Sequence, residues 1–427
     1  MSTGGESLLC VAVETGNEAE VERLLQRGYP IEEGGVPGRT PAFLAAADGN
    51  LACLRLLIKY GANVDAGDQW WGRTPLMAAA RTRQNSCMRL LIEHGADVNI
   101  ADFSGKTALI FATDFGDGEC VRTLIECGAD VNVADDDSRT PLIHAAAKGC
   151  DACVRVLLQH GADVNVKGDA GWTALIKAAE KGLGSCARLL IEHGADVNAT
   201  TDYGWTALMY AVWNGLDSAV NFLLEHSARV DMTDRFGVTA LHLAAQKARS
   251  RCVRSLLKYG ADGNAEAKDG MTALHKLALK EWCFSRAWES LVVAQLLISH
   301  GVAVDRRDGH GNTALDLLLT LKQSFQMSDG PNQCLVDLFE LLVRGGSDVN
   351  RHVNDIEKPT AFMKLLNVLE YEKEVHLGRV EYDIEGLLVI NIGRVNKAHI
   401  VRLLFEYSAN GGDGFDSLSL LEEDNGN

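Results

Sequence analysis

Apolar residues in this chain recur at the spacing of short, paired helices. Residues 139–171 show the pattern once, as two groups of apolar residues that each follow helical spacing. The groups are Leu142, Ala145 and Ala146, then Val154, Leu157 and Leu158. Gly149 and Gly161 follow the two groups, where a helix end favours a left-handed residue. The segment therefore predicts a helix, a turn, a second helix and a polar loop over 163–171.

The pattern repeats with a fixed period. A threonine followed by Pro or Ala, and in most copies then by Leu, recurs at intervals of 34, six times 33, 41 and 47 residues. These threonines are Thr40, Thr74, Thr107, Thr140, Thr173, Thr206, Thr239, Thr272, Thr313 and Thr360. A second marker, Gly-Ala-Asp-Val-Asn, runs in phase at 95–99, 128–132, 161–165 and 194–198. One helix pair cannot bury its apolar faces alone, so stacking of the units is expected to form the core.

The period, the Thr-Pro-Leu opening, the glycine between the helices and the Gly-Ala-Asp-Val-Asn marker resemble the ankyrin-repeat family. The resemblance covers roughly residues 6–410. It implies an all-α solenoid of about eleven stacked helix-turn-helix units with projecting β-turn or hairpin loops. It does not identify a partner, because function depends on the site that a fold carries.

The quality of the repeat predicts the division of the chain. The regular units are followed by units with insertions near 280–290 and 323–333, and residues 373–386 are either an insertion or a degraded repeat. The expected regions are an N-terminal capping repeat at 1–38, seven regular repeats at 39–270, two repeats with insertions at 271–357, a degenerate or C-terminal capping repeat at 358–410 and an acidic disordered tail at 411–427.

Composition and charge limit the partners. The chain has 427 residues, of which 47% are hydrophobic and 23% charged, with a net charge of −17. An acidic surface repels nucleic acid and anionic lipid, so neither is expected to bind. No apolar run reaches the ~18 residues of a membrane span, and the first residues lack the pattern of a secretory signal. We expect a monomer in the cytoplasm or nucleus.

Cysteines recur at one position of the unit. Six of them lie thirteen residues after the threonine, where the second helix should first be buried: Cys53, Cys87, Cys120, Cys153, Cys186 and Cys252. Neighbouring units are spaced too widely for disulfides, so these thiols are expected to pack as small apolar residues. Cys150 and Cys153 form a Cys-x-x-Cys motif, but a zinc site would need a second ligand pair. Packing is therefore the interpretation for this motif too.

Histidines are expected to have structural roles. His242 and His275 occupy the histidine position of the ankyrin Thr-x-Leu-His tetrapeptide, and the resemblance implies that this histidine braces the turn through hydrogen bonds. The other histidines, including His94, His160 and His193, are predicted at helix C-termini, where a cation is favourable. The sequence predicts no catalytic residue, no metal site and no cofactor.

The ankyrin resemblance implies a concave groove formed by loop tips and by the exposed side of each first helix. The residue before each threonine, and those seven and eight after it, are expected to face the groove. Basic residues predominate in the first half, as Arg73, Arg81, Lys106 and Arg139. Aromatic residues at groove positions are Trp70, Trp71, Trp172, Tyr203, Trp205, Tyr210, Trp213 and Phe236.

These aromatic residues have two interpretations. Exposed aromatic clusters near arginine are common anchors of binding energy, which favours a protein partner with an acidic or mixed-charge segment and apolar anchors. Alternatively, the rings pack on one another between adjacent loops and stiffen the array.

Two functions are compatible with these observations. The first is a non-enzymatic scaffold or adaptor that binds partner segments in the groove. The second is a substrate-receptor subunit of a ubiquitin ligase, which in the ankyrin family carries a C-terminal recruitment box; residues 358–410 would have to supply it.

The family resemblance also suggests a modification. A leucine eight residues before the asparagine resembles substrates of the asparaginyl hydroxylase that modifies hypoxia-inducible factor, which makes candidates of Asn99, Asn132, Asn165, Asn198 and Asn350.

Overall fold

The computed structural model describes residues 7–35, 38–279 and 287–322, with the short pieces 341–342, 381–382 and 388–389. The chain divides into two compact units, Met1–Ala228 and Arg229–Asn427. We call these unit 1 and unit 2 and describe each by itself. We name each repeat by its threonine, so that repeat Thr74 is the one that begins at Thr74.

Unit 1 is built from consecutive helix pairs. The pairs are α1 (Leu8–Glu14) with α2 (Glu18–Gln26), α3 (Pro41–Asp48) with α4 (Leu51–Lys59), α5 (Pro75–Thr82) with α6 (Asn85–Glu93), α7 (Ala108–Asp114) with α8 (Gly118–Glu126), α9 (Pro141–Lys148) with α10 (Asp151–Gln159), α11 (Ala174–Lys181) with α12 (Gly184–Glu192) and α13 (Ala207–Asn214) with α14 (Asp217–Glu225). A short 3-10 turn, η1 (Asp169–Gly171), precedes α11.

Unit 2 continues the same plan. Its described elements are α15 (Ala240–Gln246), α16 (Ser250–Lys258), α17 (Ala273–Ala278), α18 (Ala287–Ser299), α19 (Ala314–Lys322), and the two-residue strands β1 (Glu381–Tyr382) and β2 (Leu388–Val389). The two strands pair antiparallel, with Glu381 opposite Val389.

Local sequence chemistry sets both ends of the first helix in a repeat. In repeat Thr140, the Thr140 hydroxyl accepts a hydrogen bond from the backbone N–H of Ile143, 3.4 Å away, and caps α9. Pro141 occupies the first turn, where its missing N–H costs no hydrogen bond. Gly149 ends the helix with φ 75°, a conformation that glycine adopts without the steric cost of a Cβ atom. The threonine that marks each repeat is therefore a helix start.

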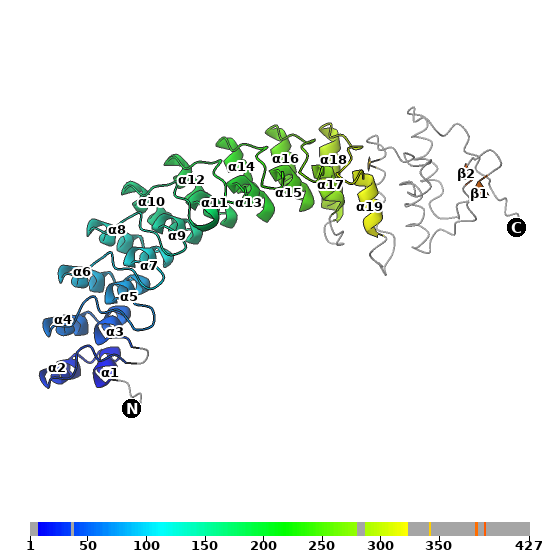
Figure 1. Cartoon of the computed structure of the whole chain (residues 1–427). Helices are drawn as coiled ribbons and strands as arrows, with labels where there is room; N and C mark the ends of the chain where they lie inside the picture. Colours follow the sequence, from blue (N-terminus) through cyan, green and yellow to red (C-terminus); the bar gives the residue numbers. More distant parts are fainter. Residues whose placement is uncertain are drawn as a thin grey trace, which may run out of the picture. The chain divides into compact units, whose positions relative to one another are not determined.

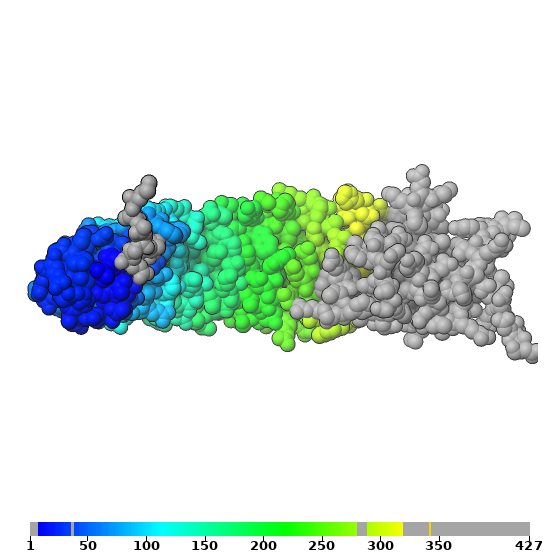
Figure 2. All heavy atoms as spheres, turned by 90° about the horizontal axis from the view of Figure 1, so that it is seen from below, coloured from blue at the N-terminus to red at the C-terminus, as the bar shows by residue number. Residues whose placement is uncertain are grey.

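The helices form two layers in unit 1. Each odd-numbered helix packs on the next odd-numbered helix and each even-numbered helix on the next even-numbered one, while the two helices of a pair also touch. Figure 1 shows these helices stacked in sequence order, and in Figure 2 the colours change steadily along unit 1. Ala145, Ala146 and Leu157 are fully buried between the layers. The small alanines allow the first-layer helices to approach closely. The predicted all-α solenoid of stacked helix pairs is confirmed.

The cysteine ladder lies in the core. The thiols of Cys53, Cys87, Cys120, Cys153, Cys186 and Cys252 are buried. Cys150 is the N-cap of α10, and its sulfur accepts a hydrogen bond from the backbone N–H of Cys153 at 3.2 Å. The Cys-x-x-Cys motif is thus a helix cap followed by a core residue, as the packing interpretation expected.

Several predicted features lie outside the described residues. They are the insertions near 280–290, of which only the last residues are described, and 323–333, most of the segments 373–386 and 358–410, the tail at 411–427 and the hydroxylation candidate Asn350. These features, the region boundaries and the ubiquitin-ligase alternative stay predictions.

Candidate protein-interaction face

Three positions of each repeat lie on one face of unit 1. They are the residue before the repeat threonine (position −1) and the fourth and seventh residues after it (positions +4 and +7). Lys106 at −1 reaches Asp114 at +7 in the same repeat, with Nζ 2.9 Å from a carboxylate oxygen. Trp205 at −1 and Trp213 at +7 have ring centroids 5.6 Å apart. We call the −1, +4 and +7 positions of repeats Thr40 to Thr206 the inner face; the first-layer helices that carry them follow one side of unit 1 in Figure 1.

Four rings on the inner face touch one another. We call Trp172, Trp205, Tyr210 and Trp213 the aromatic cluster. The ring centroid of Tyr210 lies 4.6 Å from that of Trp172 and 4.9 Å from that of Trp205. Each such contact typically contributes about 0.5–1.5 kcal/mol beyond the burial of area. All four residues are only partly buried. The rings therefore pack on one another, as one of the two interpretations has it, and they also keep an exposed surface.

A lysine covers one end of the aromatic cluster. Lys177 Nζ lies 3.4 Å from the ring centroid of Trp172, and 3.5 Å from a carboxylate oxygen of Glu180. This is a cation–π contact, which holds a positive charge beside the exposed rings. The sequence interpretation missed Lys177, although its +4 position matches that of Tyr210 in the next repeat.

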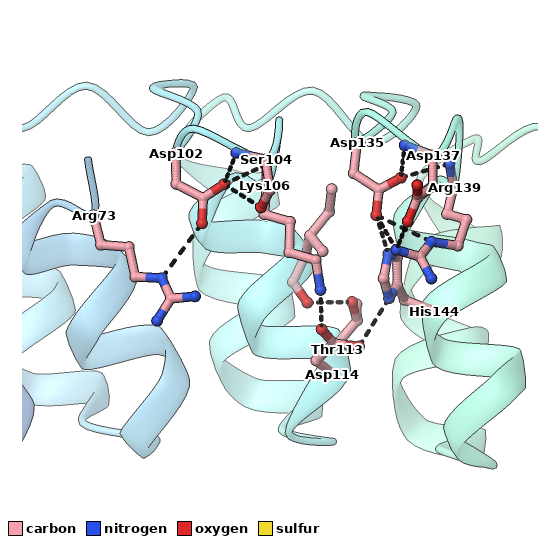
Figure 3. A network of polar contacts seen from close by, with 11 residues as sticks. Arg73, Asp102, Ser104, Lys106, Thr113, Asp114, Asp135, Asp137, Arg139 and His144 are labelled. Atoms are coloured by element: carbon pink, nitrogen blue, oxygen red, sulfur yellow. Dashed lines mark hydrogen bonds and ion pairs between the residues drawn. The ribbon is translucent and has the colours of Figure 1, made fainter. Parts of the chain in front are cut away.

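A line of alternating charges occupies the repeats before the aromatic cluster. The charged network consists of Lys106, Asp114, His144, Asp135 and Arg139 (Figure 3). His144 is central, since its Nδ1 lies 2.8 Å from Asp114 and its Nε2 lies 2.9 Å from Asp135. Lys106 pairs with Asp114 at 2.9 Å and Arg139 with Asp135 at 3.2 Å. Two of the predicted groove cations, Lys106 and Arg139, are thus paired with carboxylates of this chain.

The network changes the acidity of its carboxylates. Burial by itself would raise the pKa of Asp114, but hydrogen bonds and positive charge from His144 and Lys106 outweigh it and lower the pKa to about 2. Burial also opposes ionisation of Asp135, whose pKa is nevertheless lowered by hydrogen bonds from the Arg139 backbone and from His144. Both carboxylates are therefore ionised at neutral pH.

His144 corrects the sequence interpretation of the histidines. It was grouped with residues at helix C-termini, but it lies inside α9 at position +4 and is buried. Its two ring nitrogens face carboxylate oxygens of different residues, Asp114 and Asp135. The register contained the signal, because His144 is spaced from Thr140 as Tyr210 is from Thr206.

Three arginines gather at the N-terminal end of the inner face. We call Arg39, Arg73 and Arg81 the arginine cluster. Burial lowers the pKa of the Arg81 guanidinium, and the positive charges of Arg73 and Arg39 lower it further, so the three groups are close enough to repel one another. Within the described residues, the Arg39 and Arg81 side chains have no hydrogen bond or ion pair. The Nε of Arg39 is buried and has no hydrogen-bond partner among the residues that the structure describes.

Arg73 is held by contacts on its face and one edge. Its guanidinium carbon lies 5.1 Å from the ring centroids of both Trp71 and Phe111. Its Nε lies 3.3 Å from a carboxylate oxygen of Asp102, and Figure 3 shows this as the interaction of the Arg73 side chain with the residues drawn. Two rings and one carboxylate therefore position Arg73. Its hydrogen bond to Asp102 comes from Nε and not from the two terminal NH2 groups of the guanidinium.

The remaining predicted aromatic residues are more exposed. Trp70 and Trp71 are 66% and 51% exposed, so they present more apolar surface than any ring of the aromatic cluster. Tyr203 is half exposed in the loop before Trp205. Phe236 belongs to unit 2 and is likewise exposed, so unit 1 by itself does not group it with the cluster.

The candidate hydroxylation sites join adjacent repeats. The Asn99 side chain accepts a hydrogen bond from the backbone N–H of Asp130 at 2.9 Å and donates one to the carbonyl of Gly128 at 3.1 Å. Asn132 accepts a hydrogen bond from the next repeat in the same way, Asn165 both accepts and donates one, and Asn198 donates one. Hydroxylation of these residues stays a prediction.

His242 and His275 brace their turns as the family resemblance implied. The Nδ1 of His242 accepts a hydrogen bond from the Thr239 backbone N–H at 3.1 Å, and its Nε2 lies 3.0 Å from the carbonyl oxygen of Met271. His275 makes the same contacts with Thr272 and Asn312. Each histidine thus ties its helix start to the following loop.

The described residues contain no group of three or more His, Cys, Asp or Glu side chains placed to hold a metal ion. None of the described helices is long and apolar enough to cross a membrane.

Comparisons with known proteins give one family. Sequence profiles for ankyrin repeats match residues 9–102, 100–168, 166–234 and 223–277. No curated protein sequence matches the chain. Similar solved structures include the human ASB11 ankyrin repeat domain, with a TM-score of 0.48 and 28% identity over 54% of this chain and 99% of that one. They also include the ankyrin repeat domain of Bcl-3, a member of the IkappaB protein family, with a TM-score of 0.45 and 34% identity over 49% of this chain and 95% of that one.

Proposed function

Since this chain belongs to the ankyrin-repeat family, whose repeats mediate protein–protein interactions, we propose that it is a non-enzymatic scaffold that binds a segment of a partner protein on the inner face of unit 1. The partner carries apolar side chains that lie on the aromatic cluster. The chain binds as a monomer, in the cytoplasm or nucleus.

The observation that carries this proposal is the contact between the four rings of the aromatic cluster. Because Trp172, Tyr210, Trp205 and Trp213 already fix one another, few side-chain rotations remain to be lost on binding. Partly exposed tryptophan and tyrosine side chains are also the residues in which binding energy most often concentrates. A rigid, partly exposed row of such rings supports a binding surface.

The charges beside the cluster support a partner of mixed character. Lys177 presents a cation at the Trp172 end beside the carboxylate of Glu180, 3.5 Å away. Asp114 and Asp135 likewise compensate Lys106 and Arg139 within the charged network. A segment on the cluster therefore meets apolar surface edged by charges of both signs, which favours apolar anchors with mixed charge over a purely acidic segment.

Replacement of the rings tests the proposal. Proximity labelling in cells would compare the full chain with the Trp172→Ala, Trp205→Ala, Trp213→Ala triple variant. A matched triple variant, Tyr29→Ala, Tyr60→Ala, Tyr259→Ala, removes three rings that are not on the inner face. We expect the cluster variant alone to lose a defined set of partners while its circular dichroism melt still shows a folded chain. Identical labelling by all three proteins would exclude the aromatic cluster as the binding site.

A further inference from the structure

The geometry points to a second contact on the same face, and we propose that the arginine cluster binds a carboxylate side chain of the partner protein. This inference rests on the proposed function, because it specifies the partner chemistry at the other end of the inner face. The occupant is an Asp or Glu side chain in an extended peptide segment.

The register of the repeat shows where the carboxylate belongs. In repeat Thr107, positions −1 and +7 hold Lys106 and Asp114, which form an ion pair at 2.9 Å. In repeat Thr74, the same positions hold Arg73 and Arg81. Repeat Thr107 therefore pairs a cation with an anion at these two positions. Repeat Thr74 places two cations at the same positions and no anion.

The neighbouring repeat adds to this imbalance. Arg39 is at position −1 of repeat Thr40, and its charge reaches Arg81 together with that of Arg73. Ala47 stands at +7 in that repeat, so no carboxylate compensates Arg39 from this position. Asp102 contacts the Nε of Arg73 at 3.3 Å, but it also accepts hydrogen bonds from the backbone of Ser104 and Lys106. Asp68 also acts on Arg81, and it accepts hydrogen bonds from the backbone of Trp70 and Trp71. Two carboxylates that have other partners are therefore present for three guanidinium groups.

The local surface favours a peptide carboxylate. Arg39 and Arg73 lie against the rings of Phe43 and Trp71, at 5.4 and 5.1 Å, which fixes the guanidinium planes and leaves their edges for hydrogen bonds. Position +4 of repeat Thr74 is Ala78, so no large +4 side chain of this repeat covers Arg81. Of the three arginines, only Arg73 lies against the ring of Phe111, at +4 of the next repeat, in the contacts described. The exposed Trp70 and Trp71 beside them suit an apolar neighbour of the carboxylate.

The total charge of the chain decides between protein and nucleic acid. A net charge of −17 opposes a long polyanion, whose phosphates would extend beyond the arginine cluster. A single carboxylate in a short segment meets only the local positive charge. The cluster therefore fits an acidic side chain of a protein.

The experiment uses the full chain and two labelled peptides. One fluorescein-labelled peptide places a Glu-Glu-Trp-Glu segment in a Gly-Ser background, and the other has Gln in place of each Glu; neither has more than one aromatic anchor. Fluorescence polarisation at about 50 mM salt would measure their affinities, because exposed charge pairs are screened at higher salt. We expect the Glu peptide to bind at least about 10-fold more tightly than the Gln peptide.

The decisive variant copies the neighbouring repeat. Arg81→Asp places a carboxylate at the position of Asp114, so it should pair with Arg73, keep the chain folded and remove the preference for Glu. Arg81→Ala should weaken binding of the Glu peptide about 10-fold. Arg155→Ala removes the same charge from an exposed position on α10 and serves as the matched control, with no expected change.

Each outcome is informative. Equal binding of the Glu peptide to wild type and to Arg81→Asp would overturn the assignment. Marked destabilisation by Arg81→Ala would show that the side chain has a structural role, and tighter binding of a short oligothymidylate than of the Glu peptide would show a phosphate site instead; both also overturn it. Trp205→Ala separates the two proposals, because it changes the aromatic cluster and leaves the arginine cluster intact. The preference for the Glu peptide should therefore remain in this variant, whether or not partner labelling shows that the aromatic cluster is used.

Discussion

At the residue scale, Asp114 joins the two halves of the charged network. It accepts hydrogen bonds from His144 on the next repeat and from Lys106 on its own. Its side chain is 14% exposed, so solvent screens these interactions only partly. The network is expected to contribute to stability as well as to neutralise the face.

Replacement of Asp114 should lower the free energy of unfolding by an amount that depends on pH. Burial raises its pKa, but His144 and Lys106 lower it overall from 3.8 to about 2, so the carboxylate stabilises the fold above its unfolded pKa and loses this contribution as the pH falls from 3.8 towards 2. We expect Asp114→Asn to reduce the free energy of unfolding by about 2 kcal/mol at pH 5.5. The difference from wild type should shrink towards pH 3, as measured by urea denaturation.

A matched control removes a carboxylate that makes no hydrogen bond or ion pair with the described residues. Asp48 is exposed at the end of α3, so Asp48→Asn should leave the unfolding free energy within about 0.5 kcal/mol at every pH. A difference for Asp114→Asn that stays constant from pH 5.5 to pH 3 would contradict the assigned ion pairs.

The buried thiols give a second residue-scale prediction. Burial raises the pKa of Cys87 to about 11 and, with the nearby charge of Asp117, that of Cys120 to about 12. Since the thiolate is the reactive form, both should resist iodoacetamide at pH 8 in the native chain and react in urea. Cys127 is exposed and is the internal control. Alkylation of Cys87 or Cys120 as fast as that of Cys127, measured by peptide mass spectrometry, would contradict the burial.

Single residues also mark the limit of sequence reasoning. The repeat predicted that Lys106, Arg139 and Trp205 share one face, because their spacing from the threonine is constant. It did not predict that Asp114 and Asp135 neutralise the first two, since contacts between repeats depend on side-chain rotamers. His144 and Lys177 were missed because position +4 was not recognised as part of the face in every repeat, although Tyr210 was placed on it.

At the element scale, the third residue after the threonine separates the two units. In the described repeats of unit 2 it is His242, His275 or Asp316, each of which hydrogen-bonds to the threonine at the start of its helix. In unit 1 it is apolar in the repeats that begin with a threonine, for example Ile143 in α9 and Ile176 in α11. The same helix start is thus stabilised by hydrogen bonds in one unit and by apolar packing in the other.

This difference predicts that mild acid weakens unit 2 first. Burial lowers the pKa of His242 and of His275 below 6.5, so the unfolded state binds more protons and stability is lost as the pH falls through 6.5. Hydrogen exchange, corrected for intrinsic rate, should show reduced protection of α15 and α17 between pH 7.5 and pH 5.5. Protection of α3 and α5 should be unchanged.

A variant that copies the apolar third residue of the repeats in unit 1 supplies the control. In the His242→Ile, His275→Ile variant, the pH dependence in α15 and α17 should disappear, whatever the absolute stability. Persistence of the acid effect in that variant would show that other groups cause it.

At the scale of the whole molecule, the sequence predicted the architecture well. A period of 33 residues, a capping threonine and a closing glycine each specify local structure, and stacking follows because one helix pair cannot bury its own core. The inner face was predicted only in outline. The register places side chains on it, whereas the ring contacts of Tyr210 and the unpaired charge of Arg81 depend on the three-dimensional packing of several repeats.

The central claim is that partners bind the inner face of unit 1, and hydrogen exchange of the full chain with and without a partner recovered by proximity labelling tests it most directly. We expect protection in the loop and first-helix segments 172–181 and 205–214, and in 73–82 if the arginine cluster takes part. The second-layer helices α10, α12 and α14 should exchange as before. Protection confined to those second-layer helices or to unit 2, with none at 172–181 and 205–214, would contradict the account.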